Sequence, residues 1–249
     1  MGWRLSLTPI QSHTAVLELH ELIATRDPLF IDDGDRFTLA LNHPAAKETI
    51  VEFTQRRTVK TVAVMLLLAA ISQPIYTALY LGAPEIDRQL IWGLEGLLFV
   101  LLAAFAGSAL VMARRYTLGF SAIAFSAVLN VVQVGVGLTQ FGPFGEAAEA
   151  NAEFSGVATS VVAFSFFGYN AAKILLGLAA IVFGMSRMSE GGKVLGTITV
   201  LIGAIAFVAN TLVLLFGLQG FLPSPVAGGS GVLATLFLAI CLFGLKSED

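Results

Sequence analysis

The sequence predicts an all-α membrane protein with six transmembrane helices. Of its 249 residues, 56% are hydrophobic and 12% are charged, and the mean hydropathy is +0.83. A soluble domain carries about 25% charged residues. From about residue 59 onward, six long apolar runs follow one another, separated by Gly, Pro and charged residues. Because about 20 apolar residues cross roughly 30 Å of hydrocarbon, each run is long enough to span a bilayer.

The apolar runs place the six spans near residues 60–82, 89–112, 118–140, 157–186, 194–217 and 229–246. The fourth is long enough to tilt or to begin outside the hydrocarbon. The chain therefore divides into a short N-terminal segment, 1–58, and a six-helix transmembrane domain, 59–249.

Positive charges in the short flanks predict one orientation for the whole bundle. Lys and Arg concentrate on cytoplasmic loops of membrane proteins. With six spans, nearly all flanking cations fall on one face, and the other face has Arg88 together with five carboxylates. Both termini are therefore expected in the cytoplasm, and the chain in the cytoplasmic (inner) membrane. The cations of the first face are Arg56, Arg57, Lys60, Arg114, Arg115, Arg187, Lys193 and Lys246, and the carboxylates of the second are Glu85, Asp87, Glu146, Glu149 and Glu153.

The N-terminal segment is too short to bury a core of its own. Residues 16–23 alternate between apolar and polar in a moderately amphipathic pattern, which predicts a helix on the membrane surface or on a partner. Two short extended pieces follow over 30–41, with a turn at Asp32–Asp35, and a helix beginning near Asn42 leads into the first span. We expect this segment to be a cytoplasmic cap or docking element.

Lys173 is the most informative residue of the spans, because it lies near the middle of the fourth one. A lysine at that depth costs about 2.5–3.5 kcal/mol on insertion scales. Tyr169 and Asn170 lie one turn before it on the same face, which is therefore expected to face the bundle interior. Glu95, in the second span, is the candidate counter-charge. The pair would be either an ion or proton site, or a buried contact that fixes helix register.

Further polar residues form faces on other spans. In the third span, Asn130 and Gln133 belong to a stripe that either lines a solute path or supplies interhelical hydrogen bonds, of which we favour the second. In the fifth span, Gly203, Asn210 and Gly217 recur at intervals of seven and predict a close-packing seam. The loop over 141–156, with Glu146, Glu149 and Glu153 among alanines, is expected to be a short surface helix with one acidic face.

Matching offsets raise the hypothesis of an internal repeat. Asn130 is followed by Gly137 and Pro143, and Asn210 by Gly217 and Pro223, at identical distances along the chain. The bundle would then consist of three helical hairpins in parallel orientation.

Catalytic signals are weak throughout the chain. All three histidines lie before the first span and lack metal-ligand spacing, and the spans hold no nucleophile with a base near it. The sequence predicts no metal site and no cofactor, and it leaves room for bound lipid or pigment. We expect a non-catalytic subunit or assembly factor of a membrane complex. Its partners would be the bilayer and other membrane subunits or a second copy, not nucleic acid. The alternative is a small-solute or ion transporter or channel that uses Lys173 and Glu95.

Overall fold

The computed structural model describes residues 54–82, 89–217 and 224–245 of the 249-residue chain. These residues belong to one unit, Thr54–Asp249. Throughout this part of the chain the secondary structure is helical, and six helices are long and apolar enough to cross a membrane. The expected all-α fold with six candidate spans is therefore confirmed. The predictions made for residues 1–53 and for the loop around Arg88 lie outside the described residues.

Each long helix corresponds to one apolar run of the sequence. The helices are α2 (Gln55–Gly82), α3 (Gln89–Met112), α4 (Thr117–Ala150), α5 (Ser155–Ser189), α6 (Lys193–Phe216) and α7 (Ser224–Phe243), with a 3-10 turn, η1 (Ala152–Phe154), between α4 and α5.

The largest departure from the sequence prediction is the length of α4. This helix does not end near residue 140 but passes through Pro143 and ends at Ala150. Proline removes one backbone hydrogen bond from a helix interior. The alanines and glutamates that follow it are strong helix formers, which favours continuation. The acidic stretch expected as a separate surface helix is therefore divided: Glu146 and Glu149 lie in the last part of α4, and Glu153 lies in η1.

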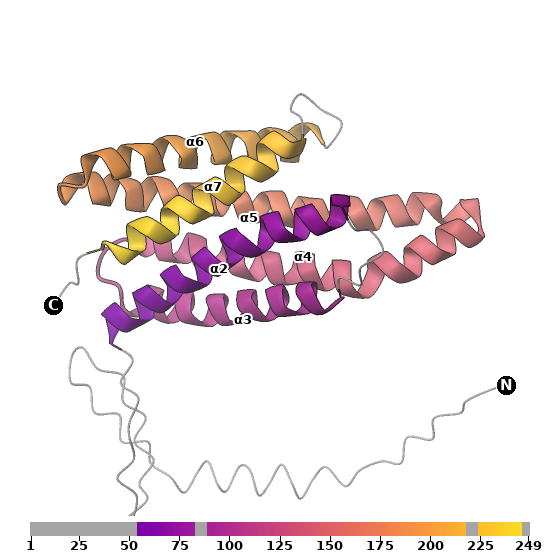
Figure 1. The fold of residues 1–249 in the computed structure, drawn as a ribbon, viewed down its shortest axis with the longest axis horizontal. Coiled ribbons are helices and arrows are strands. Elements are labelled where there is room, and N and C mark those ends of the chain that lie inside the picture. The colour runs from indigo at the N-terminus through magenta and orange to yellow at the C-terminus, as the bar shows by residue number, and fades with distance from the viewer. Residues whose placement is uncertain (1–53, 83–88, 218–223, 246–249) are drawn as a thin grey trace, which may run out of the picture. The chain divides into compact units, whose positions relative to one another are not determined.

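Five of the six long helices form a closed cycle of contacts, and Figure 1 shows the helices from the side. Along this cycle α2 contacts α3, α3 contacts α4, α4 contacts α5, α5 contacts α7, and α7 returns to α2. Helix α6 lies outside the cycle, against α5 and α7. Among the described residues, no Cα atom of α2 lies within 8 Å of one of α5. A side chain that joins these two helices must therefore cross the interior.

Glycines set the closest helix contact, between α5 and α6. A Cβ atom added to Gly177 would lie 2.8 Å from the backbone oxygen of Gly203, and one added to Gly196 would lie 2.5 Å from that of Gly184. The predicted seam on α6 is thus correct for Gly203, but Gly217 does not belong to it. Gly217 ends α6 with a φ of 79°, in the left-handed region that glycine adopts without strain.

Candidate functional site: a buried polar network

Lys173 crosses the interior of the bundle from α5. The residue is 1% exposed, and its Nζ donates a hydrogen bond to Oε1 of Gln73 on α2, at 2.8 Å. The ammonium also lies 5.1 Å from the ring centroid of Tyr169, within cation–π range. The aliphatic stem packs on α7, where a Cβ added to Gly231 would lie 2.7 Å from Lys173 Cδ. One side chain thus joins α5 to α2 and α7.

Glu95 enters the same interior from α3 and is 7% exposed. Its Oε1 lies 3.2 Å from Oγ of Ser72, the α2 residue next to Gln73. The Ser72 hydroxyl also lies 3.1 Å from the backbone oxygen of Ala69. A hydroxyl has one proton to donate, so Ser72 shares it between these two acceptors.

Lys173 and Glu95 do not form a direct ion pair in the structure. Each binds a neutral side chain instead, and the two neutral partners are consecutive residues of α2. The opposite charges still act on one another through space. An ammonium has three donors and a carboxylate about four acceptor positions, so both groups keep hydrogen-bonding capacity beyond the contacts described here. The arrangement can hold three helices together, and it can also bind a water molecule or an ion between the charges.

An aromatic cluster lies one helical turn from this network. Tyr76, three residues after Gln73, stacks on Trp92, three residues before Glu95, with ring centroids 5.0 Å apart. Trp92 also meets Phe141 of α4 edge to face at 5.6 Å. Its ring sits on Gly137, where an added Cβ would lie 2.5 Å from the indole. Trp92 lies nearer the start of α3 than Glu95 does, so the cluster is on that side of the polar network.

The side-chain amides of Asn130 and Asn170 bond within their own helices, whereas the backbone of Gln133 joins α4 to α5. The Asn170 amide donates to the backbone oxygen of Phe166, at 2.7 Å. Asn130, 0% exposed, donates to the backbone oxygen of Ser126 at 2.9 Å, and its Oδ1 has no hydrogen-bond partner among the described residues. Gln133 is half-buried and accepts a hydrogen bond from Ser165 of α5 through its backbone oxygen, at 3.3 Å.

Asn210 lies apart from these residues, where α6 meets α7. Its amide donates to the backbone oxygen of Ala206, at 2.8 Å, and to that of Ala227 on α7, at 3.2 Å. It therefore joins two helices. Its local geometry resembles that of Asn130, because both amides bond to the residue four positions earlier and both Oδ1 atoms lack a partner in the described part of the chain. The three-hairpin repeat stays a prediction.

Of the seven polar residues singled out in the sequence, three therefore gather in one network: Lys173, Tyr169 and Glu95. Sequence reasoning missed the partners that α2 contributes, Ser72 and Gln73. The available signal was their position directly before Pro74 inside an apolar run. It did not identify a partner because Gln73 and Lys173 are one hundred residues apart in sequence, and no periodicity relates them.

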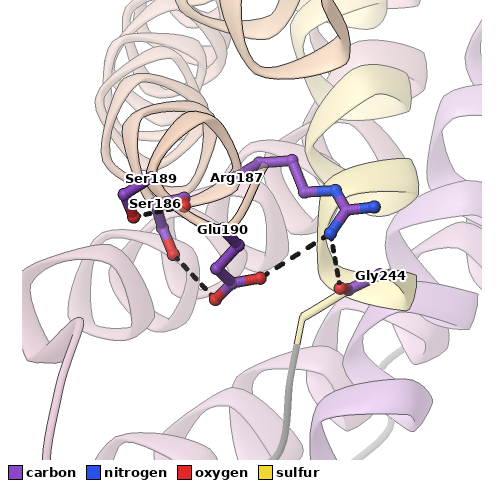
Figure 2. A network of polar contacts seen from close by, with 5 residues as sticks. All are labelled: Ser186, Arg187, Ser189, Glu190 and Gly244. Carbon is purple, nitrogen blue, oxygen red and sulfur yellow. Dashed lines mark hydrogen bonds and ion pairs between the residues drawn. The ribbon is translucent and has the colours of Figure 1, made fainter. Parts of the chain in front are cut away.

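A second polar network lies at the C-terminal end of α5 (Figure 2). Nη1 of Arg187 donates to the backbone oxygen of Gly244, just after α7, at 3.1 Å, and lies 3.7 Å from Oε2 of Glu190. A cation is favoured at a helix C-terminus, where backbone oxygens lack helical partners. Ser186 donates to the other oxygen of Glu190, at 3.4 Å. Arg187 therefore fastens the end of α7 to α5.

Within the described residues, no three His, Cys, Asp or Glu side chains gather closely enough to hold a metal ion. Comparison with known proteins finds no matching family model, no similar curated protein and no similar solved structure. Any argument about function therefore depends on the residues of this chain alone.

Proposed function

We propose that this chain is a non-catalytic integral membrane protein that serves as a subunit or assembly scaffold of a membrane complex. The observation that carries this proposal is the burial of Lys173, which is 1% exposed and bonded to Gln73. A transporter must bring water or solute to such a charge from at least one side of the membrane. Here the charge joins α5 to α2, and its stem fills the space beside Gly231 of α7. Buried polar groups used in this way specify which helices pack together.

The orientation proposed for the bundle has both termini in the cytoplasm. In support, cations lie at the start of α2, between α3 and α4, in the last turn of α5 and at the start of α6, which are at the same end of alternating helices. The connection between α4 and α5 carries carboxylates and no cation. By the positive-inside tendency, the basic end faces the cytoplasm and the membrane is the cytoplasmic one. Arg115→Cys and Glu149→Cys, each with Cys241 replaced by alanine and labelled with an impermeant maleimide in intact cells, test this orientation. Labelling at 149 alone is expected, and labelling at 115 alone would overturn it.

The native mass of the protein, extracted in mild detergent from its own membrane, tests the subunit proposal. A discrete complex with other polypeptides supports it. Recovery as a monomer in several mild detergents would contradict the subunit proposal. The variant Lys173→Met adds a second test, since a structural lysine can be replaced without loss of the complex when Met fills the same volume.

A second candidate function, ion or small-solute transport, is favoured by one observation. Lys173 and Glu95 lie in the same interior without pairing directly, and intramembrane charges often mark ion pathways. Liposomes containing the purified protein can be tested with proton, sodium and chloride gradients. Flux that is lost in both Lys173→Met and Glu95→Gln would favour transport. Equal leakage of wild type, variants and empty liposomes would argue against it.

A further inference from the structure

The hairpin of α4 and α5 is longer than the rest of the bundle. Helix α4 has 34 residues and α5 has 35, against 24 in α3 and in α6. Ten additional residues correspond to about 15 Å of helix. Figure 1 shows the joined ends of α4 and α5 extending past the ends of α3 and α6. We call residues 141–163 the projecting hairpin. Helices of this length exceed the roughly 30 Å of the hydrocarbon.

The projecting hairpin has an apolar groove between its two helices. The groove is open on one side and encloses about 290 Å³. Pockets for small molecules occupy about 300–1,000 Å³, so this groove fits one or two side chains of a partner better than a separate ligand. Its lining includes Phe141, Phe144 and Gly145 of α4, with Ala158, Val161 and Val162 of α5.

The glycines of the projecting hairpin are not explained by packing inside the chain. Elsewhere, glycines such as Gly177 and Gly203 allow two helices to approach closely. At Gly142, Gly145 and Gly156, as at Gly93, Gly107 and Gly135, an added Cβ would instead meet nothing within 4 Å. Glycine destabilises a helix relative to alanine. Bare backbone beside an open apolar groove is suited to the close approach of another helix.

The charge of the projecting hairpin has a single sign. Glu146, Glu149 and Glu153 are all exposed. The sequence has no Lys or Arg between Arg115 and Lys173 to balance them. This surface repels anionic lipid headgroups and the same surface of a second copy, because like charges oppose close approach. It is complementary to a basic partner.

We propose that the projecting hairpin docks a helical segment of a partner protein, with apolar side chains seated in the groove and Lys or Arg facing the three glutamates. The inference rests on the proposed function as a component of a complex, for which it names the docking surface and the chemistry of the partner. Apolar anchors supply the binding energy of such helix-in-groove contacts, and charges at the rim set the on-rate and salt dependence.

A defined peptide tests the docking surface directly. The probe is a fluorescent synthetic helix with leucines on one face and lysines on the other, titrated against the full-length protein in phosphatidylcholine nanodiscs. A peptide with glutamates in place of the lysines is its control. We expect the triple variant Glu146→Gln, Glu149→Gln, Glu153→Gln to bind the lysine peptide about tenfold more weakly than wild type, with less salt dependence. Equal binding by the triple variant and wild type would overturn the proposal.

A matched pair of substitutions tests the groove. Ala158 lines it, and Ala163 is exposed on the same helix outside the lining. We expect Ala158→Trp, which fills the groove, to weaken peptide binding, and Ala163→Trp to leave it unchanged. The same effect from both would contradict groove docking. A photoreactive residue at position 158, but not at 163, is likewise expected to cross-link the partner in native membranes, which remains informative if Ala158→Trp does not fold.

The native complex separates failure of this inference from failure of the proposed function. If a hetero-complex is isolated and survives the triple Glu→Gln substitution and Ala158→Trp, the docking surface is wrong and the proposed function stands. If no complex is isolated, the proposed function fails, and the peptide titration decides the docking inference by itself.

Discussion

Removing the acceptor of Lys173 should destabilise the bundle more than removing Lys173 itself. In Gln73→Leu, the ammonium loses an oxygen that lies 2.8 Å away, yet it stays buried at 1% exposure. A hydrogen bond to a charged group contributes about 1.5–3 kcal/mol, while contacts between membrane helices average about 0.6 and reach about 1.7 kcal/mol. Because the donor here is charged and enclosed, we expect a loss of about 2 kcal/mol in the free energy of unfolding, which lies within the first range and just above the second.

Replacing the donor, in Lys173→Met, should lower the free energy of unfolding far less. Methionine keeps an unbranched stem against Gly231 and removes the charge that needs an acceptor. A lysine in the middle of a span costs about 2.5–3.5 kcal/mol. Removing it recovers that cost, which offsets the lost through-space attraction to Glu95, whose hydrogen bond to Ser72 is unaffected. We therefore expect Lys173→Met to unfold at or above the wild-type free energy. The double variant should resemble Lys173→Met, which gives a coupling energy of about 2 kcal/mol in the double-mutant cycle.

Reversible unfolding in mixed detergent micelles, followed by circular dichroism, gives the free energy of unfolding of wild type, the two single variants and the double variant. The matched control is Gln133→Leu, because Gln133 is also a half-buried glutamine of the spans and its side chain makes no hydrogen bond among those of the described residues. This control should change stability by less than about 0.5 kcal/mol. If Gln73→Leu and Gln133→Leu prove equally mild, or if the cycle shows no coupling, the hydrogen bond does not hold α5 to α2.

Three further predictions follow from packing. Gly177→Ala should destabilise the protein by about 1–3 kcal/mol, since the added Cβ would lie 2.8 Å from a backbone oxygen of α6; Gly135→Ala, which meets nothing within 4 Å, should be neutral or stabilising in the same unfolding assay. Gly137→Ala should displace the Trp92 indole, because the added Cβ would lie 2.5 Å from it, and should shift its fluorescence emission, measured with the other of the chain's 2 tryptophans replaced; an unchanged spectrum would contradict this packing. The Cys241 thiol, in a residue 1% exposed, should react with maleimide only as fast as the bundle unfolds; rapid labelling of the native protein would show that α7 opens locally.

The helix number and positions followed from the sequence because hydropathy is a local property. A run of about 20 apolar residues must be helical in lipid, since each backbone group needs an internal partner. The end of α4 was the exception, because Pro143 is typical of a helix end, and the acidic stretch after it was expected as a separate helix. Helix continuation there depends on the residues that follow the proline.

Part of the candidate site was also visible in the sequence. A lysine in mid-span is costly wherever its helix packs, so Lys173 could be identified without a structure, and its helical spacing placed Tyr169 beside it. The partner could not be identified in the same way. Glu95 was the obvious counter-charge by type, yet the ammonium bonds to Gln73, since which side chains meet depends on how helices distant in sequence are arranged.

Local chemistry thus determined what each segment is: six apolar helices, a charge that must be buried, and an acidic connection between the third and fourth spans. Tertiary structure alone decided which segments meet. It brought α2 into contact with α7 and placed α6 outside the cycle of the other five helices. It also placed Ser72 beside Glu95 and Gln73 beside Lys173. The physical reason is that hydropathy and helical periodicity act over a few turns of one helix. Contacts between helices depend on how glycines and side-chain shapes fit across the interior, and that fit exists only once the chain has packed.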